Sequence, residues 1–315
     1  MASDFFLKLE GFAGEAVEHK IHQDFIKLGN AFDHLGDAFI KLVDDASSNN
    51  ATGGLAVAQE VHIKHDIVSI SDDFLKIGDD FIKLDTDLQK FDDAFVNSTD
   101  QFIIKIGGIE GDSAGDQGSI NLGDDFHNVE TDLNGAGQDF IKLGADFIKL
   151  NDASDLTLDQ KFEQVSDDFI KIENDLHKVG DDFVKIGGDF IKVGDLSDSP
   201  VLDQAFHRLG DDSIKVGDDF IKVSDDFLKI AQDFGQPAAT SETIKLDQGV
   251  LSHADDFIKL DSDLHKLDAD LHKLGGDYLK IAEALEKAEH ESHHESSGNT
   301  ALDQLLQAAH DFSLL

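Results

Sequence analysis

The chain has 315 residues, with 66 acidic against 26 basic side chains, a formal net charge of −40 at pH 7, and 24 Phe but no Cys. The lack of cysteine excludes a disulfide scaffold, a zinc–thiolate site and a cysteine nucleophile. A field this negative repels phosphate, so we expect neither nucleic acid nor an anionic membrane surface as a partner.

A short repeat dominates the sequence. The string Asp-Phe-(Ile/Leu/Val)-Lys-(Leu/Ile/Val) occurs eleven times, and neighbouring copies lie seven residues apart. In a strand, a seven-residue step would turn the Phe to the opposite face at each copy, whereas a helix keeps it on one side. Within a copy, the apolar residues also fall at the +3 and +4 offsets of an amphipathic helix. We therefore predict long helices with Phe at heptad position a and Leu, Ile or Val at position d.

Turn-rich segments separate the ladders of repeats. Pro200 and Pro237 both fall in these breaks, and Ser199-Pro200 is typical of a helix start. Short connections favour antiparallel neighbours. The predicted fold is therefore all-α, an elongated antiparallel helical bundle built from heptad-like repeats of the coiled-coil type. The predicted helices are residues 16–45, 56–107, 121–152, 157–195, 200–235 and 244–290, with a short tail helix at 301–313.

The same pattern predicts the domain organisation. Residues 1–289 form the heptad-repeat bundle, and residues 107–120 are the place where it could divide into two sub-bundles. Residues 290–300 form a His/Ser-rich linker, and residues 301–315 form an amphipathic tail.

The polar face of the repeat carries Asp and Lys. Each Asp pair lies three and four residues before a Lys, a spacing that favours helix ion pairs of about 0.2–0.5 kcal/mol each. We expect these carboxylates to be solvated and to share near-identical surroundings, which argues against acid–base catalysis and for a protein that is not an enzyme. Gly recurs at position e at a cost of about 1 kcal/mol against Ala in a helix. We expect it there because it lets another backbone or a Phe ring approach closely.

The Phe ladders are the predicted packing and interaction surface. The apolar face is wider than a two-stranded coiled-coil seam, so it suits a helix with several neighbours or a helix lying on an apolar surface. The residues predicted to form this surface are Phe74, Phe81, Phe95, Phe102, Phe140, Phe147, Phe169, Phe183, Phe190, Phe220, Phe227 and Phe257.

Histidines provide the candidate metal ligands. Spacings of +3 and +4 among His290, His293 and His294 place two imidazoles on one helical face, as a transition metal requires, and a solvated His-rich tract is the alternative. The repeated Asp pairs predict weak, multi-site binding of divalent cations, and we expect no other cofactor. Five further histidines take position b, where we expect water-tolerant residues at the rim of the apolar face: His127, His177, His207, His265 and His272.

The last residues invite a separate prediction. Asp311 and Phe312, followed by Leu314 and Leu315, place an acid before apolar residues at the C-terminus. This ending resembles the uncleaved export signal of type I secretion substrates, and the cysteine-free, acidic composition is similar to that group. The resemblance implies an extracellular protein that leaves by a leaderless route, consistent with an N-terminus that lacks the regions of a secretory signal. The alternative is a tail that docks on the bundle of a cytoplasmic protein.

These observations leave three functions open. The first is a non-enzymatic structural or interaction protein that associates with itself or with another helical protein. The second is an amphipathic coat protein for lipid or another apolar surface, as the wide apolar face allows. The third is an extracellular protein that responds to divalent cations. No stretch reaches the roughly 18 apolar residues of a membrane span, so we expect no such span.

Overall fold

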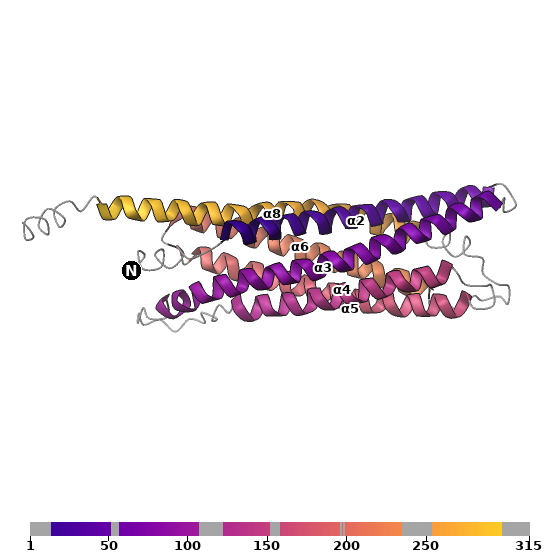
Figure 1. Ribbon diagram of the computed structural model, residues 1–315, viewed down its shortest axis with the longest axis horizontal. Helices are drawn as coiled ribbons and strands as arrows, with labels where there is room; N and C mark the ends of the chain where they lie inside the picture. Colours follow the sequence, from indigo (N-terminus) through magenta and orange to yellow (C-terminus); the bar gives the residue numbers. More distant parts are fainter. Residues whose placement is uncertain are drawn as a thin grey trace, which may run out of the picture.

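The computed structural model describes residues 14–51, 57–106, 122–151, 158–195, 197, 199–234 and 254–297. The elements in these ranges are all α-helices, and they run along the long axis of an elongated molecule (Figure 1). The predicted all-α bundle is therefore confirmed. The helices are α2 (Gly14–Ala51), α3 (Val57–Ile106), α4 (Leu122–Asn151), α5 (Leu158–Asp195), α6 (Pro200–Phe234) and α8 (Ala254–Ser297).

The six helices form a closed ring. Each packs against two neighbours, in the order α2, α3, α4, α5, α6, α8 and back to α2. Facing residues at each interface advance along one helix as they recede along the other, so neighbours are antiparallel. For example, Gly180 faces Gly217 and Gly187 faces Gly210. Six is an even number, so α2 and α8 can also meet antiparallel and close the ring.

Phenylalanine rings fill the inside of this ring. Phe32 of α2 lies 5.9 Å from Phe81 of α3, 6.1 Å from Phe140 of α4 and 6.3 Å from Phe220 of α6, measured between ring centroids. Rings from opposite sides of the bundle therefore meet at its axis. Among the predicted packing residues, Phe95 and Phe102 lie in α3 but their side chains fall outside the described part, and the other ten are buried in the core.

Two kinds of interface alternate around the ring. Positions e and g flank the core position a on opposite sides, so antiparallel neighbours bring e against e on one side and g against g on the other. The e–e interfaces are α3·α4, α5·α6 and α8·α2, and they are tight: small residues mostly face each other at the first two, and glycine faces Asp or His at α8·α2. The g–g interfaces (α2·α3, α4·α5 and α6·α8) carry Asp. One repeated heptad thus supplies both surfaces that a closed ring needs.

The helix boundaries follow the local signals. Helix α6 begins at Pro200, and the backbone N–H of Asp203 donates to the carbonyl oxygen of Ser199 at 2.9 Å, which makes Ser199 the residue that caps the helix. Helix α2 runs to Ala51, six residues past the predicted end, through a Ser/Asn-rich stretch. Helix α8 runs to Ser297, so the backbone of residues 290–297 is helical where a linker was expected.

Candidate functional site

Paired carboxyl groups line the three g–g interfaces. We call each row a carboxyl ladder, because successive pairs are seven residues apart on both helices at α4·α5 and α6·α8, and 21 residues apart at α2·α3. The α6·α8 ladder pairs Asp212 with Asp277, Asp219 with Asp270, and Asp226 with Asp263. The α4·α5 ladder pairs Asp125 with Asp189, Asp132 with Asp182, Asp139 with Asp175, and Asp146 with Asp168. The α2·α3 ladder pairs Asp24 with Asp87 and Asp45 with Asp66.

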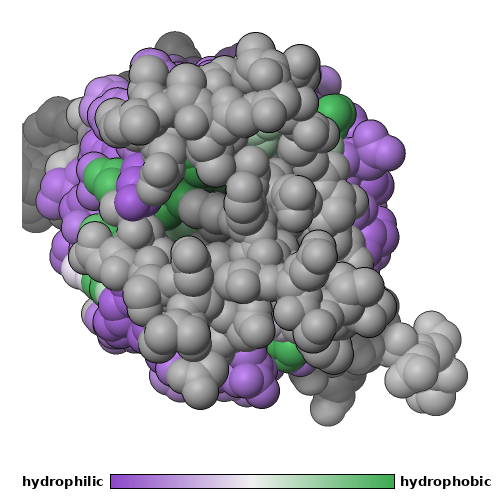
Figure 2. Space-filling model, turned by 90° about the vertical axis from the view of Figure 1, so that its right-hand side faces the viewer, coloured by the Kyte–Doolittle hydropathy of each residue, from purple (hydrophilic) through white to green (hydrophobic). Residues whose placement is uncertain are grey.

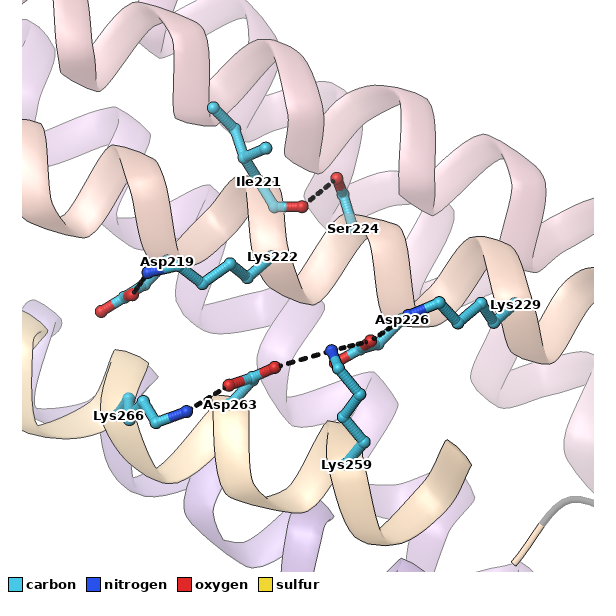
Figure 3. A network of polar contacts seen from close by, with 9 residues as sticks. All are labelled: Asp219, Ile221, Lys222, Ser224, Asp226, Lys229, Lys259, Asp263 and Lys266. Atoms are coloured by element: carbon cyan, nitrogen blue, oxygen red, sulfur yellow. Dashed lines mark hydrogen bonds and ion pairs between the residues drawn. The ribbon is translucent and has the colours of Figure 1, made fainter. Parts of the chain in front are cut away.

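Lysines close over these pairs from outside. In the close-up of the α6·α8 ladder, Lys259 of α8 reaches across to Asp226 of α6, and its Nζ lies 3.0 Å from Asp263 Oδ2 (Figure 3). Lys266 then donates to Asp263 Oδ1 at 2.5 Å, from the same helix. Most ladder Asp residues pair with the Lys three residues later, with a Lys of the neighbouring helix, or with both. The ion pairs predicted within helices are present, and a second set joins the helices.

The burial of these carboxylates corrects one sequence-based expectation. The polar face was expected to be solvated and uniform, but the two Asp residues of a repeat differ. Asp225 is exposed whereas Asp226 is 1% exposed, and Asp167 is exposed whereas Asp168 is 1% exposed. The second Asp is at position g, next to the core Phe, and the neighbouring helix covers it. The expectation was wrong because it treated each helix as having one covered face.

Burial changes the protonation of the ladders. Burial and the facing carboxyl of Asp132 together raise the pKa of Asp182 to about 7. Burial and Asp277 raise the pKa of Asp212 to about 6, against the opposing effect of Lys273. At Asp146 burial also favours the neutral acid, but hydrogen bonds from Asp168, Lys149 and Lys142 outweigh it and lower the pKa to about 2. In the pairs Asp146–Asp168, Asp226–Asp263 and Asp212–Asp277, the pKa of one carboxyl is raised and that of the facing carboxyl is lowered.

Glycines set the distance at the e–e interfaces, as the sequence analysis expected. A Cβ on Gly187 would lie 2.6 Å from the carbonyl oxygen of Gly210, and one on Gly217 would lie 2.5 Å from that of Gly180. The neighbouring backbone occupies the space of the missing side chain. Gly188, by contrast, has no atom within 4 Å of the same position. The helix cost of glycine at position e is therefore offset by close backbone packing.

One groove in the described part lies between α2 and α3, with a volume of about 710 Å³. Four lysines line it, but three already pair with acids: Lys27 with Asp24, Lys83 with Asp80, and Lys90 with Asp87. An active site needs groups in distinct environments around one reacting atom. This groove instead presents the same Asp–Lys pairs that recur along the ring.

Two groups of residues that could hold a metal ion were not recognised from the sequence. They are Asp37, Asp261 and His265, between α2 and α8, and Asp195, Asp203 and His207, between α5 and α6. The signal was an Asp four residues before the His, at the position that glycine usually takes. It was overlooked because these histidines were interpreted one by one as rim residues.

The predicted histidine cluster and the C-terminal tail lie at or beyond the end of the described residues. His290, His293 and His294 lie on the helical backbone of α8, but their side chains are outside the described part. The tail residues Asp311, Phe312, Leu314 and Leu315 also lie outside it. None of the described helices has a stretch long and apolar enough to cross a membrane. Comparison of the chain with protein-family models, with curated proteins and with solved structures gave no match.

Proposed function

We propose that this chain is a non-enzymatic structural or interaction protein, a rod that completes its core within one chain and meets partners through its carboxylates. The observation that carries the proposal is the closed ring, which turns the Phe ladders of all six helices toward one axis. The exposed large apolar side chains in the described part are only Val68, Ile148, Ile170 and Ile258. In an end view, the described surface is mostly hydrophilic, with small separate apolar patches (Figure 2).

This architecture reduces the case for two other functions. A coat for an apolar surface would have to open the ring, and each Phe moved out of the core would lose about 1.5–3 kcal/mol of burial. Self-association through the Phe faces meets the same cost. A partner of positive charge needs no such opening, because the net charge of −40 attracts it to the folded rod. The proposed partner is therefore a cationic protein or polymer.

The oligomeric state and helix content test the proposal. Light scattering and circular dichroism of the full chain should show a helical monomer whose melting temperature does not change with protein concentration. Neutral lipid vesicles should leave the helix content unchanged. A stable oligomer with a concentration-dependent melt, or a large gain of helix on lipid, would overturn it.

Partner chemistry has a separate test. Polylysine should bind the folded chain with an affinity that falls steeply as salt is raised, since exposed charges are screened. A neutral hydrophilic polymer of equal length is the control. Equal binding of both polymers would contradict recognition by charge.

The carboxyl ladders favour a second candidate, a protein whose stability responds to divalent cations. Asp212 Oδ2 and Asp226 Oδ2 are buried and have no hydrogen-bond partner unless these carboxyls carry a proton and donate it to the facing Asp277 and Asp263. A divalent ion could replace that proton. Calcium at constant ionic strength should then raise the melting temperature, and the double variant Asp212→Asn/Asp277→Asn should respond less. A flat response of the unmodified chain would end this candidate.

A further inference from the structure

Two histidines lie among acids at two separate e–e interfaces. In each group, one ligand atom from each of the three residues lies within 4.8 Å of the other two. One group joins α2 to α8 through Asp37, Asp261 and His265, and the other joins α5 to α6 through Asp195, Asp203 and His207 (Figure 1). These are the only such groups among the residues that the structure describes.

Both groups arise from the same change in the repeat. At contacts such as Gly180–Gly217 a small residue faces a small residue, but here Asp261 faces Gly36 and Asp203 faces Gly194. A Cβ on Gly36 would lie 2.5 Å from Asp261 Oδ1, and one on Gly194 would lie 2.7 Å from His207 Nδ1. The glycine thus leaves the room that the polar side chain occupies. The residue after each glycine is an Asp that supplies the second carboxylate.

Backbone hydrogen bonds orient both imidazoles alike. Nδ1 of His207 lies 2.9 Å from the carbonyl oxygen of Asp203, and Nδ1 of His265 lies 3.0 Å from that of Asp261. Oδ1 of the same two Asp residues also lies beside Nδ1, at 2.8 Å and 3.3 Å. A carbonyl only accepts, so Nδ1 carries a hydrogen and the lone pair of a neutral ring is on Nε2. A metal-bound histidine is usually held in this way, with its other ring nitrogen donating to a backbone carbonyl or carboxylate.

Nε2, the ring nitrogen with the lone pair, faces a carboxylate of the neighbouring helix. Nε2 of His207 lies 3.3 Å from Asp195 Oδ1, a member of its group, and Nε2 of His265 lies 2.9 Å from Oδ1 of Asp33, a further carboxylate outside the group of three. A lone pair and a carboxylate oxygen repel each other unless a cation lies between them. The cation is either a proton on the ring or a metal ion shared by the imidazole and the carboxylates.

We propose that these two groups are binding sites for a divalent transition metal of the zinc type, one ion at each site. One imidazole nitrogen with carboxylate oxygens suits zinc, cobalt or nickel, whereas calcium and magnesium take oxygen ligands. The surrounding negative charge raises the local concentration of any cation. A bound ion would clamp two helices together at each interface. This inference does not depend on the proposed interaction function.

Cobalt absorption and zinc calorimetry on the full chain test the proposal. Every chain measured should carry the substitutions His290→Gln, His293→Gln and His294→Gln, because that histidine cluster is a separate candidate metal site. Excess magnesium should be present to occupy the diffuse ionic atmosphere. Two ions per chain are expected, and the single variants His207→Gln and His265→Gln should each remove one of them.

The chain supplies a matched control in His272. Its Nδ1 lies 2.9 Å from the carbonyl oxygen of Asp268, which faces Gly29, but the residue after this glycine is Asn30 instead of an Asp. His272→Gln should leave both ions bound, and circular dichroism should show that every variant keeps its helix content. The proposal is overturned if no ion binds under these conditions, or if the double variant His207→Gln/His265→Gln binds as many ions as its parent.

Discussion

Two adjacent glycines in α5 should respond oppositely to the same substitution. Gly187 and Gly188 are consecutive residues of α5, but only Gly187 lies at an e–e contact. A methyl group on Gly187 would lie 2.6 Å from the carbonyl oxygen of Gly210, 2.8 Å from Ile214 Cγ1 and 2.9 Å from the backbone nitrogen of Ile214. Two of these atoms belong to the backbone, so a side-chain rotation cannot relieve the contact and α5 must move away from α6.

The expected magnitudes follow from two opposing effects. Ala is better than Gly in a helix by about 1 kcal/mol, and this gain applies to both positions. Overpacking a tight interface costs about 1–3 kcal/mol, and this cost applies only to Gly187. Gly188→Ala should therefore raise the free energy of unfolding by about 0.4–1 kcal/mol. Gly187→Ala should lower it by up to about 2 kcal/mol, which is the overpacking cost of about 1–3 kcal/mol less the helix gain of about 1 kcal/mol.

Urea unfolding followed by circular dichroism measures both variants against the unmodified chain. The pair Gly275→Ala and Gly276→Ala in α8 gives a milder comparison: a Cβ on Gly275 would lie 3.0 Å from His22 Nδ1, whereas one on Gly276 would meet no atom within 4 Å. If Gly187→Ala were as stabilising as Gly188→Ala, the e–e interface would not be tight, and glycine at position e would not be needed for close backbone packing.

Three further changes test the core, the ladders and the buried hydroxyls. Phe140→Ala removes a ring that contacts four others within 6.1 Å, so we expect a loss of about 3–5 kcal/mol by urea unfolding; a loss below about 1 kcal/mol would contradict the packed core. The pKa of Asp182 is about 7 in the folded chain, so at a pH between its ordinary pKa and about 7 this carboxyl takes up a proton when the chain folds. The free energy of unfolding should therefore rise as the pH falls from about 7 to about 4. Asp182→Asn should weaken this rise, whereas Asp181→Asn, at an exposed residue, should not. If both variants showed the same dependence of stability on pH, the carboxyl ladder would not be the cause of the rise. Ser166→Ala removes a 2.7 Å hydrogen bond to the carbonyl oxygen of Ala231 and should cost about 1 kcal/mol by thermal unfolding; an unchanged melt would show that water replaces the hydroxyl.

Much of the fold could be predicted because heptad periodicity is a local property. The predicted helix 157–195 is observed as Leu158–Asp195, and the predicted helix 200–235 as Pro200–Phe234. The packing role of glycine at position e also followed from sequence, since its helix cost required a compensating contact. These predictions needed only the spacing of residues along one helix.

The candidate sites needed more than spacing. Asp225 and Asp226 are adjacent and chemically identical, and nothing local says that the second is covered by α8. The groups around His207 and His265 each combine residues of two helices, so neither is visible in one heptad. From sequence, metal binding is predicted at His290, His293 and His294, because the spacing of ligands along one helix is visible without knowing its neighbours.

By itself, the sequence determined that the chain winds into long amphipathic helices, which bury Phe and begin and end near their breaks. The tertiary structure decided which flank of each helix is tight and which holds buried acids. The physical reason is that positions e and g are equivalent on an isolated helix, since both border the apolar face. They become different only when antiparallel neighbours close a ring, bringing glycine against glycine at one contact and aspartate against aspartate at the next.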